Sequence, residues 1–232
     1  MLCAFVFLCL WCVCAGGFWC DDAGNLWDHT IEQIELLDAG SSFSTSDVGE
    51  RIPKLMIAGE KVPRLTALLE LCRELSLGLN LEVKHVTEQS YMAPTAQEQQ
   101  MEEELADIVC DTIEASKVQP NALIFSSFSR PAIAVLRRRL PHFCCGFLVE
   151  EIPDDWEAFM ALHQCASLNF WWKHAGNTQA RIQECTSKVP CYSYTVNDGY
   201  VAARLLSWGV SGVFSDCPHV VSMALDDAHV AS

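Results

Sequence analysis

A short alternating segment, residues 79–84, carries the side chains best suited to chemistry. Apolar and polar residues alternate along it. A period of two predicts a strand with Asn80, Glu82 and Lys84 on one face and three apolar residues on the other. A carboxylate and an ammonium two residues apart can hold a hard cation and a phosphate side by side. The alternative is that Glu82 and Lys84 form an ion pair at the strand end that satisfies only each other's charge.

Other polar residues invite a chemical interpretation, and each also has a structural one. His85 follows Lys84 and faces the opposite side by strand alternation, so we expect a structural or exposed histidine. Tyr194 lies in an apolar strand-like run, where a core aromatic is common. Residues 137–139 are three arginines, which we expect on a solvated helix face. Asp154 and Asp155 suit a helix N-terminus, where negative charge is favourable.

Helical and strand-like segments alternate from residue 63 onwards, and they must position these side chains. Apolar periodicity and capping residues predict helices that begin near residues 65, 95, 129, 156, 178 and 201. Between them lie expected strands at 79–84, 121–126, 144–149, 166–170, 191–196 and 212–215. This alternation predicts an α/β fold with a parallel sheet and helices outside it. We expect a polar loop within 88–100 and no regular structure after Val221.

Composition narrows the classes of function. The chain has 232 residues, half of them hydrophobic, which suits one domain with a sizeable core. Its net charge of -15 argues against nucleic acid as a partner, because acidic proteins do not attract phosphate backbones. Among the thirteen cysteines, Cys9, Cys12 and Cys14 come nearest to the spacing of a zinc site, but they lie in an apolar run with no second ligand pair to match. We expect the cysteines in strand-like runs, at positions 144, 145, 165 and 191, to be buried thiols that behave as small hydrophobic residues, not disulfides or ligands.

Several sequence blocks, in this order and spacing, resemble the glycerophosphodiester phosphodiesterase family. The blocks are Asn80-Leu81-Glu82-Val83-Lys84, Leu123-Ile124-Phe125-Ser126-Ser127-Phe128, Tyr194-Thr195-Val196-Asn197, Leu205-Leu206-Ser207-Trp208-Gly209-Val210 and Gly212-Val213-Phe214-Ser215-Asp216, with weaker matches at residues 37–41 and 62–65. The resemblance covers roughly residues 24–222. It implies a TIM-type (β/α) barrel that hydrolyses glycerophosphodiesters to an alcohol and glycerol 3-phosphate, with a divalent cation, calcium or magnesium.

The resemblance also assigns roles to individual residues. Glu82 matches a carboxylate that binds the metal, and Lys84 matches a contact to the substrate phosphate. Ser127 matches the turn after the next strand. Tyr194 stands where the family usually has a tryptophan at the mouth of the site, and Asn197 matches a polar residue of the same motif. We predict metal binding at Glu82 and substrate binding at the other four.

The sequence departs from the family before residue 79. The family domain opens with strands that carry a His-Arg pair, a Glu-x-Asp metal pair and a second histidine. No arginine precedes Arg51, and no Glu-x-Asp precedes Glu82. We therefore expect an N-terminally truncated family member with an incomplete barrel over 21–225 and a tail at 226–232. No catalytic residue is assigned, and we expect an inactive isolated chain, weak or no divalent binding, and self-association through the open barrel edges.

Residues 1–20 form an uninterrupted apolar run that contains no lysine or arginine. The run is long enough to span a bilayer as a helix, and it could also be a secretory signal, a spurious start of the reading frame or a packed strand. A genuine signal or anchor implies a secreted or membrane protein; otherwise we expect a cytoplasmic one. The alternative function is a membrane-anchored binding module without catalysis, held by residues 1–20. In either case the expected small-molecule partner is a glycerophosphodiester.

Overall fold

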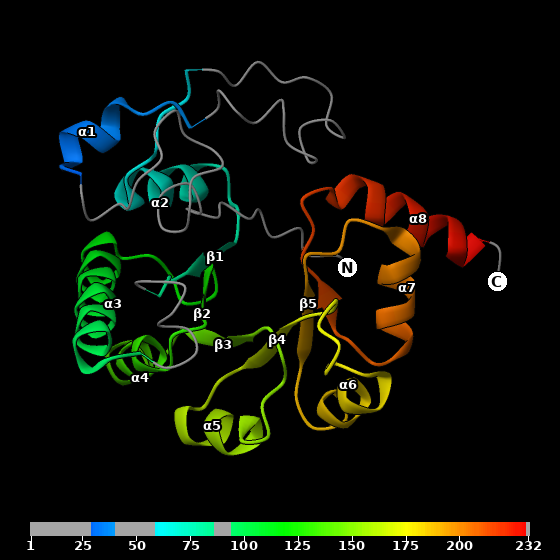
Figure 1. Ribbon diagram of the computed structural model, residues 1–232. Helices are drawn as coiled ribbons and strands as arrows, with labels where there is room; N and C mark the ends of the chain where they lie inside the picture. The colour runs from blue at the N-terminus through cyan, green and yellow to red at the C-terminus, as the bar shows by residue number, and fades with distance from the viewer. Residues whose placement is uncertain (1–28, 40–58, 86–93, 231–232) are drawn as a thin grey trace.

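Six parallel strands form one curved sheet with helices around its outside (Figure 1). The computed structural model describes residues 29–39, 59–85 and 94–230. Strand order follows the chain, from β1 to β6 without a break. The strands are β1 Leu79–Glu82, β2 Leu123–Ser127, β3 Cys144–Val149, β4 Ser167–Trp171, β5 Cys191–Tyr194 and β6 Gly212–Val213. This is the incomplete (β/α) barrel that the sequence predicts.

A helix lies between each strand and the next. Parallel pairing requires such a crossover, because the chain must return to the end of the sheet at which the previous strand began. The helices are α1 Ile31–Leu36, α2 Leu65–Glu74, α3 Ala96–Ser116, α4 Arg130–Arg139, α5 Trp156–His163, α6 Gln179–Thr186, α7 Gly199–Ser207 and α8 Pro218–Val230. Thr95 and Glu98 form the predicted capping box of α3. Thr178 caps α6, and Gly209, with φ of +91°, ends the segment that follows α7 in a conformation that favours glycine.

The two faces of the sheet differ in chemistry. The face toward the helices is apolar, with Leu81, Phe125 and Phe147 each at most 4 % exposed. The inner face carries most of the polar strand residues beside larger ones such as Leu148, and the register aligns Glu82 with Ser126 and Ser126 with Gly146. Buried helix-facing side chains stabilise the sheet by removing apolar surface from water. The inner face is left to hold polar side chains.

The buried face of α3 differs from the predicted one. Apolar periodicity predicts that Met101, Leu105, Ile108, Val109 and Ile113 point inward. Ile113 is buried as predicted, and Leu105 and Val109 pack partly buried against the core, but Ile108 is 62 % exposed. The other buried residues are Glu102, Ala106 and Cys110, because small residues at 106 and 110 let α3 approach α4 closely.

The C-terminal segment also corrects a prediction. Residues after Val221 were expected to lack structure, yet α8 runs from Pro218 to Val230. Val221, 3 % exposed, and the partly buried Leu225 pack into the core. Helical order there comes from this packing, which intrinsic propensity alone does not reveal.

Two predicted segments, residues 1–20 and residues 88–93 of the expected loop, lie outside the described residues. The rest of that loop, from Ala96, is the first turn of α3. Within the described part of the chain, no helix is both long and apolar enough to cross a bilayer.

The cysteines that the structure describes are free thiols, and most are buried. Burial raises the pKa of Cys110, Cys165 and Cys185 to about 11 and that of Cys191 to about 12. Thiols with raised pKa values are poor nucleophiles near neutral pH. The prediction of small core residues is confirmed for Cys145 and Cys191, and Cys165 is partly buried against the core, whereas the exposed Cys144 contradicts it.

Candidate functional site

Glu82 and Lys84 meet at the carboxyl end of β1. The Lys84 Nζ lies 2.6 Å from Glu82 Oε1, and both side chains are 13 % exposed. Glu82 ends the strand, and Lys84 follows two residues later, so alternation places both on the same side. The carboxyl ends of parallel strands are where barrels of this kind place their sites. The pair is thus partly desolvated yet open enough to meet a small ligand.

Ser127, predicted to bind substrate, holds the backbone. Its side chain is 0 % exposed and faces the helix layer, one position beyond the inward-facing Ser126. The Ser127 hydroxyl donates to the Val83 carbonyl at 2.5 Å and accepts from the Ser129 N–H at 2.9 Å. It therefore ties β2 to the backbone between Glu82 and Lys84. Both hydrogen bonds of the hydroxyl go to backbone groups, which gives Ser127 a backbone-holding role, and its predicted contact with substrate stays a prediction.

Aromatic side chains surround this strand end. The Phe128 ring stands edge-on to the rings of His85 and Tyr194, with centroids 6.0 Å apart in each pair. The half-buried Tyr194 hydroxyl donates to the Val149 carbonyl at 2.7 Å. Tyr194 ends β5, so it reaches across the sheet toward the end of β3. The structure brings Tyr194 to the same end of the sheet as Glu82 and Lys84.

Asn197 organises the loop after β6. Its side-chain amide donates to an Asp216 carboxylate oxygen at 2.9 Å. Its carbonyl oxygen accepts from the Ser215 hydroxyl at 3.0 Å and from the Asp216 N–H at 2.9 Å. These contacts give Asn197 a loop-holding role, and its predicted contact with substrate remains a prediction.

Glu102 is a buried carboxylate that the sequence analysis missed. It is 1 % exposed and accepts a hydrogen bond from the Ser129 hydroxyl at 2.6 Å. Ser129 in turn caps α4 by accepting from the Ala132 N–H. A signal was present in the sequence, because Glu102 shares a helical stripe with Ala106, Cys110 and Ile113. A charge on the buried stripe of a helix indicates a polar partner in the core.

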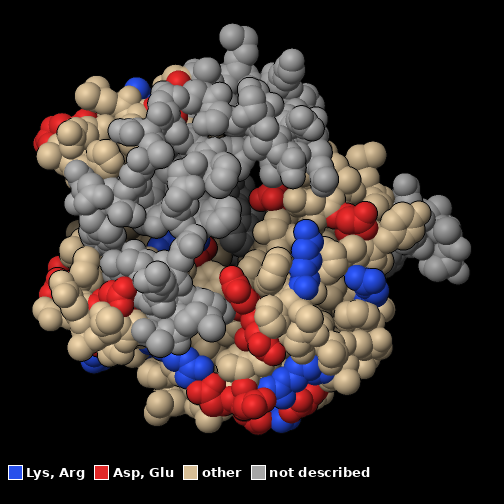
Figure 2. Space-filling view, in the orientation of Figure 1, with Lys and Arg blue, Asp and Glu red and all other residues tan. Residues whose placement is uncertain are grey.

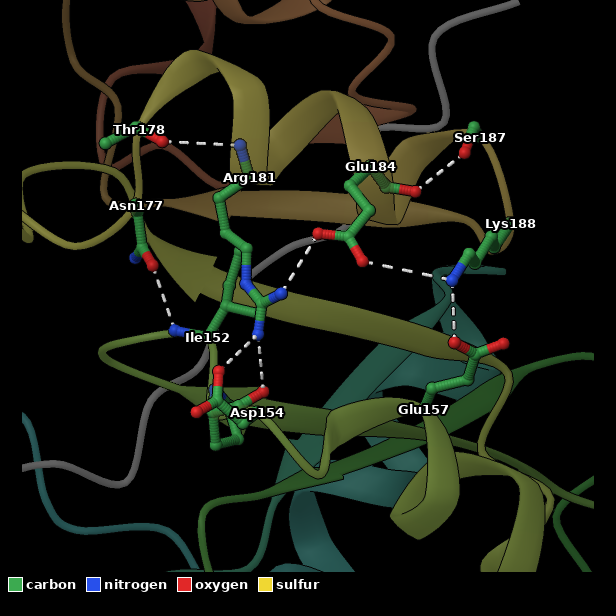
Figure 3. Close-up of polar contacts among 10 residues, drawn as sticks. Ile152, Asp154, Glu157, Asn177, Thr178, Arg181, Glu184, Ser187 and Lys188 are labelled. Atoms are coloured by element: carbon green, nitrogen blue, oxygen red, sulfur yellow. Dashed lines mark hydrogen bonds and ion pairs between the residues drawn. The ribbon is translucent and has the colours of Figure 1, made fainter.

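The loop after β3 is held in place by residues of α6 and of the loop before it (Figure 3). The Asn177 side chain accepts from the Ile152 N–H at 2.9 Å and donates to the Glu150 carbonyl at 2.6 Å. Arg181 donates to the Pro153 carbonyl at 3.0 Å and contacts Asp154 at 3.3 Å. These residues keep the loop in one conformation at the carboxyl end of the sheet.

The predicted acidic N-terminus of α5 is present, but its role differs from simple dipole stabilisation. Asp155 stands at the N-cap and makes no side-chain cap hydrogen bond. Both of its oxygens accept from Arg130 at 2.7 Å, and this contact lowers the pKa of Asp155. The guanidinium of Arg130 also lies over the rings of Phe147 and Phe159.

The three consecutive arginines are only partly solvated, which corrects the expected exposed face. Arg137 donates to the carbonyls of Phe143 and His163. Arg139 contacts Asp107 and two further carboxylates of α3. Only Arg138 is exposed.

The described donors do not by themselves suit a divalent cation. Calcium takes about six to eight oxygen ligands and magnesium about six. Glu82 is one carboxylate, and one of its oxygens faces the Lys84 ammonium at 2.6 Å. No group of three histidine, cysteine, aspartate or glutamate side chains is placed to hold a metal within the described ranges.

Comparison with known proteins identifies the family. The sequence matches the profile of the glycerophosphoryl diester phosphodiesterase family over residues 19–220. The chain belongs to this family. Family members are generally metal-dependent, and metal binding at Glu82 stays a prediction.

Individual relatives agree with the family. A glycerophosphodiester phosphodiesterase of Bacillus subtilis is 25 % identical over 195 residues, which are 82 % of this chain and 62 % of the relative. One from Caldanaerobacter subterraneus is 24 % identical over 201 residues, 85 % of this chain and 72 % of the relative. The chain thus spans less than two thirds of the length of the first relative.

Solved structures share the fold. A phosphodiesterase of Oleispira antarctica, in complex with the product sn-glycerol-3-phosphate, superposes with a TM-score of 0.70 at 24 % identity, over 89 % of this chain and 74 % of that one. A glycerophosphodiester phosphodiesterase from Parabacteroides distasonis gives a TM-score of 0.64 at 16 % identity, over 86 % and 72 %. The similarity covers the curved sheet and the helices around it.

Proposed function

We propose that the carboxyl end of the sheet binds the phosphate of a glycerophosphodiester through Lys84. The proposal rests on the Glu82–Lys84 ion pair at the end of β1. Its Nζ and Oε1 atoms are 2.6 Å apart, and each side chain is 13 % exposed. An ammonium at this depth has lost part of its water shell, so a phosphate oxygen placed beside it meets a stronger field than at an open surface. The Oleispira antarctica relative, solved with sn-glycerol-3-phosphate, supports this choice of ligand.

The residues around Lys84 have separate tasks in this proposal. Glu82 orients the ammonium and is one ligand for a divalent cation in a more complete site. Tyr194, held by the Val149 carbonyl, supplies an aromatic wall at the mouth. Asn197 keeps the loop after β6 in place beside that mouth. Ser127 holds the backbone beneath Lys84 and is not assigned a contact with substrate.

We further propose that the 232-residue chain alone binds such esters without hydrolysing them at an appreciable rate. Proton transfer to the leaving oxygen and from the attacking water needs positioned acid and base groups. The family motifs that carry its two histidines have no match in this sequence. His85 packs against Phe128, and this ring contact favours a structural role.

Titration with sn-glycerol 3-phosphate by calorimetry and NMR tests the site. We expect saturable binding that is lost in Lys84→Met, whereas Lys188→Met, which removes the same charge from an exposed position, retains it. Absence of saturable binding in the unmodified protein would overturn the assignment. Release of glycerol 3-phosphate from a glycerophosphodiester, with calcium or magnesium added, is measured in parallel. Hydrolysis faster than the rate in buffer, lost in Lys84→Met, would show that the chain is active. It would also support Lys84 as part of the site.

We also propose self-association through the open edges of the sheet. In the described sheet, β1 and β6 are the first and last strands of the order. Strand edges present backbone groups that can pair with another chain. Sedimentation velocity over a range of concentrations tests this, and a single monomeric species at high concentration would contradict it.

A further inference from the structure

Glu102 has no part in the proposed phosphate site as described so far, yet it is a buried carboxylate. It lies on the buried side of α3, 1 % exposed, and α3 packs beside α4 (Figure 1). Burying a carboxylate is costly unless it is hydrogen-bonded. One Glu102 oxygen accepts from the Ser129 hydroxyl at 2.6 Å, a distance typical of a hydroxyl that donates to a carboxylate. The contact with Ser129 is therefore the place to look for a role.

Capping of α4 alone does not account for Glu102. Ser129 caps α4 by accepting from the Ala132 N–H at 3.0 Å. Thr178 caps α6 in the same way, by accepting from the Arg181 N–H at 3.3 Å. Among the described residues, no carboxylate accepts a hydrogen bond from the Thr178 hydroxyl. A cap of this kind thus forms without a buried carboxylate, so the cap on α4 does not require Glu102.

A second group of Ser129 links Glu102 to the strand end. The Ser129 N–H donates to the Ser127 hydroxyl oxygen at 2.9 Å, and the Ser127 hydroxyl donates to the Val83 carbonyl at 2.5 Å. The contacts form one chain that runs from the Glu102 carboxylate through both serines to this carbonyl. Both serines are at most 4 % exposed, so water competes little for these groups and each bond holds the next in place.

The chain of contacts ends at the peptide group that joins Val83 to Lys84. Regular pairing of β1 with β2 stops at Glu82, and the Val83 N–H then donates to the Ser126 carbonyl at 2.9 Å. Past this bond, the Val83 carbonyl accepts from a side chain, the Ser127 hydroxyl. Because a peptide group is planar, holding this carbonyl also fixes the N–H of Lys84 and the direction in which the chain continues.

We infer that Glu102 is a positioning residue for Lys84. Its carboxylate holds Ser129, and Ser129 sets the direction of the Ser127 hydroxyl. That hydroxyl holds the peptide group from which Lys84 extends toward Glu82. The consequence for phosphate binding rests on the proposed function, whereas the restraint on Lys84 is a property of the free protein and is measured without a ligand.

Backbone order at Lys84 in the full chain tests the inference. In the unmodified protein, we expect NMR relaxation to give its amide an order parameter near the ~0.85 of a rigid backbone. In Glu102→Ala, we expect a fall toward the ~0.6 that marks a flexible one, because the Ser129 hydroxyl loses its acceptor. Glu102→Gln keeps a carbonyl oxygen for that hydroxyl, so this conservative variant should retain the order of the unmodified protein.

A double-mutant cycle locates the effect in the chain of contacts. Ser129→Ala removes the hydroxyl and keeps the N–H, so we expect a fall in order at Lys84 similar to that in Glu102→Ala. The double variant should show no further fall, because both substitutions break the same contact. Ser129→Ala also tests the inference from the other partner if Glu102→Ala fails to fold.

Ile113→Ala is the matched control for a simple loss of stability. Ile113 is 1 % exposed on the same buried side of α3, and its side chain is apolar. We expect Ile113→Ala to lower the unfolding midpoint and to leave the order at Lys84 unchanged. Titration with sn-glycerol 3-phosphate then measures the effect on binding. We expect about tenfold weaker binding in Glu102→Ala and a change within about twofold in Glu102→Gln and Ile113→Ala.

Four outcomes would overturn the inference. The first is unchanged order at Lys84 in both Glu102→Ala and Ser129→Ala, and the second is an equal fall in Ile113→Ala. The third is a fall in Glu102→Gln as large as in Glu102→Ala, and the fourth is unchanged affinity for sn-glycerol 3-phosphate in Glu102→Ala. If the unmodified protein does not bind this ligand, the phosphate site itself is overturned, and the order parameters still decide whether Glu102 positions Lys84.

Discussion

Two groups of polar side chains use the same kinds of contact in different surroundings. The strand-end group comprises Glu82, Lys84, Glu102, Ser127 and Ser129, whose side chains or residues are at most 13 % exposed. The helix-surface group, between α5 and α6, comprises Asp154, Glu157, Arg181, Glu184 and Lys188, with side chains 22 % to 108 % exposed (Figure 3). Figure 2 shows basic and acidic side chains interleaved over this lower region of the molecule.

The difference between the two groups lies in the solvent around them. Exposed ion pairs gain little, because water and salt screen the charges and the long side chains lose freedom. A buried or partly buried polar pair adds little net stability while both partners are present. Removing one partner is costly, because the other is left without a hydrogen bond and out of contact with water. The strand-end group should therefore be sensitive to single substitutions, and the helix-surface group tolerant of them.

The largest effect is expected for Ser127→Ala. This substitution adds no atoms and removes the partner of the Val83 carbonyl and of the Ser129 N–H, both in the buried strand end. We expect the free energy of unfolding to fall by about 3 kcal/mol. Urea unfolding followed by circular dichroism measures the change.

The matched control for this prediction is Ser187→Ala. The Ser187 hydroxyl donates to the Glu184 carbonyl at an exposed helix end, so we expect a change within about 0.5 kcal/mol. Equal losses in Ser127→Ala and Ser187→Ala would remove the contrast between the two groups.

The next effect is expected for Lys84→Met. It leaves the Glu82 carboxylate, 13 % exposed, without the ammonium at 2.6 Å. We expect a loss of about 2 kcal/mol, below the full cost for a completely buried pair because some water reaches the site. Thermal unfolding should show a lower midpoint than that of Lys188→Met, which we expect to match the unmodified protein. A larger loss in Lys188→Met would reverse the ranking of the two groups.

A smaller effect is expected for Arg181→Met. Arg181 contacts the Pro153 carbonyl, Asp154 and Glu184, and its side chain is 22 % exposed. We expect a loss of about 1 kcal/mol that shrinks between 0.1 and 1 M sodium chloride, because salt screens exposed charges. The loss in Lys84→Met should change less with salt. The contrast fails if salt reduces both losses equally.

The smallest effect concerns pH. Burial, and next the charge of Arg130, lower the pKa of His163 on α5 below its ordinary value of 6.5. The unfolded chain therefore takes up this proton first as the pH falls below about 6.5, and the folded state loses stability between that pH and the lowered pKa. His163→Asn should flatten this part of the stability curve by a few tenths of a kcal/mol. Urea unfolding from pH 5 to 8 measures it, and an unchanged curve would contradict the assignment.

Much of the fold could be predicted from local patterns. The strand at residues 144–149 and the capping box at Thr95 match their predicted bounds, because alternation and capping are encoded by neighbouring residues. The buried face of α3 could not be predicted in the same way. Its orientation depends on which residues let α4 approach, and periodicity alone leaves a choice between adjacent stripes.

The candidate site shows the same division. Motif order identified Glu82 and Lys84, and strand alternation placed them on one face. Ser127 stands one position from Ser126, and the register decided that Ser127 faces the helices. Glu102 joins the site from a helix that ends seven residues before β2 begins, so only packing against Ser129 reveals its place.

The sequence by itself determined the alternation of strands and helices, the family and the pair of charges at the end of β1. These follow from short-range periodicity and from residues close together in the chain. Tertiary structure alone decided which hydroxyls hold backbone, where the buried carboxylate lies and how Phe128 packs between His85 and Tyr194. Those features depend on contacts between residues far apart in the chain, and burial sets their energies once the sheet has curved.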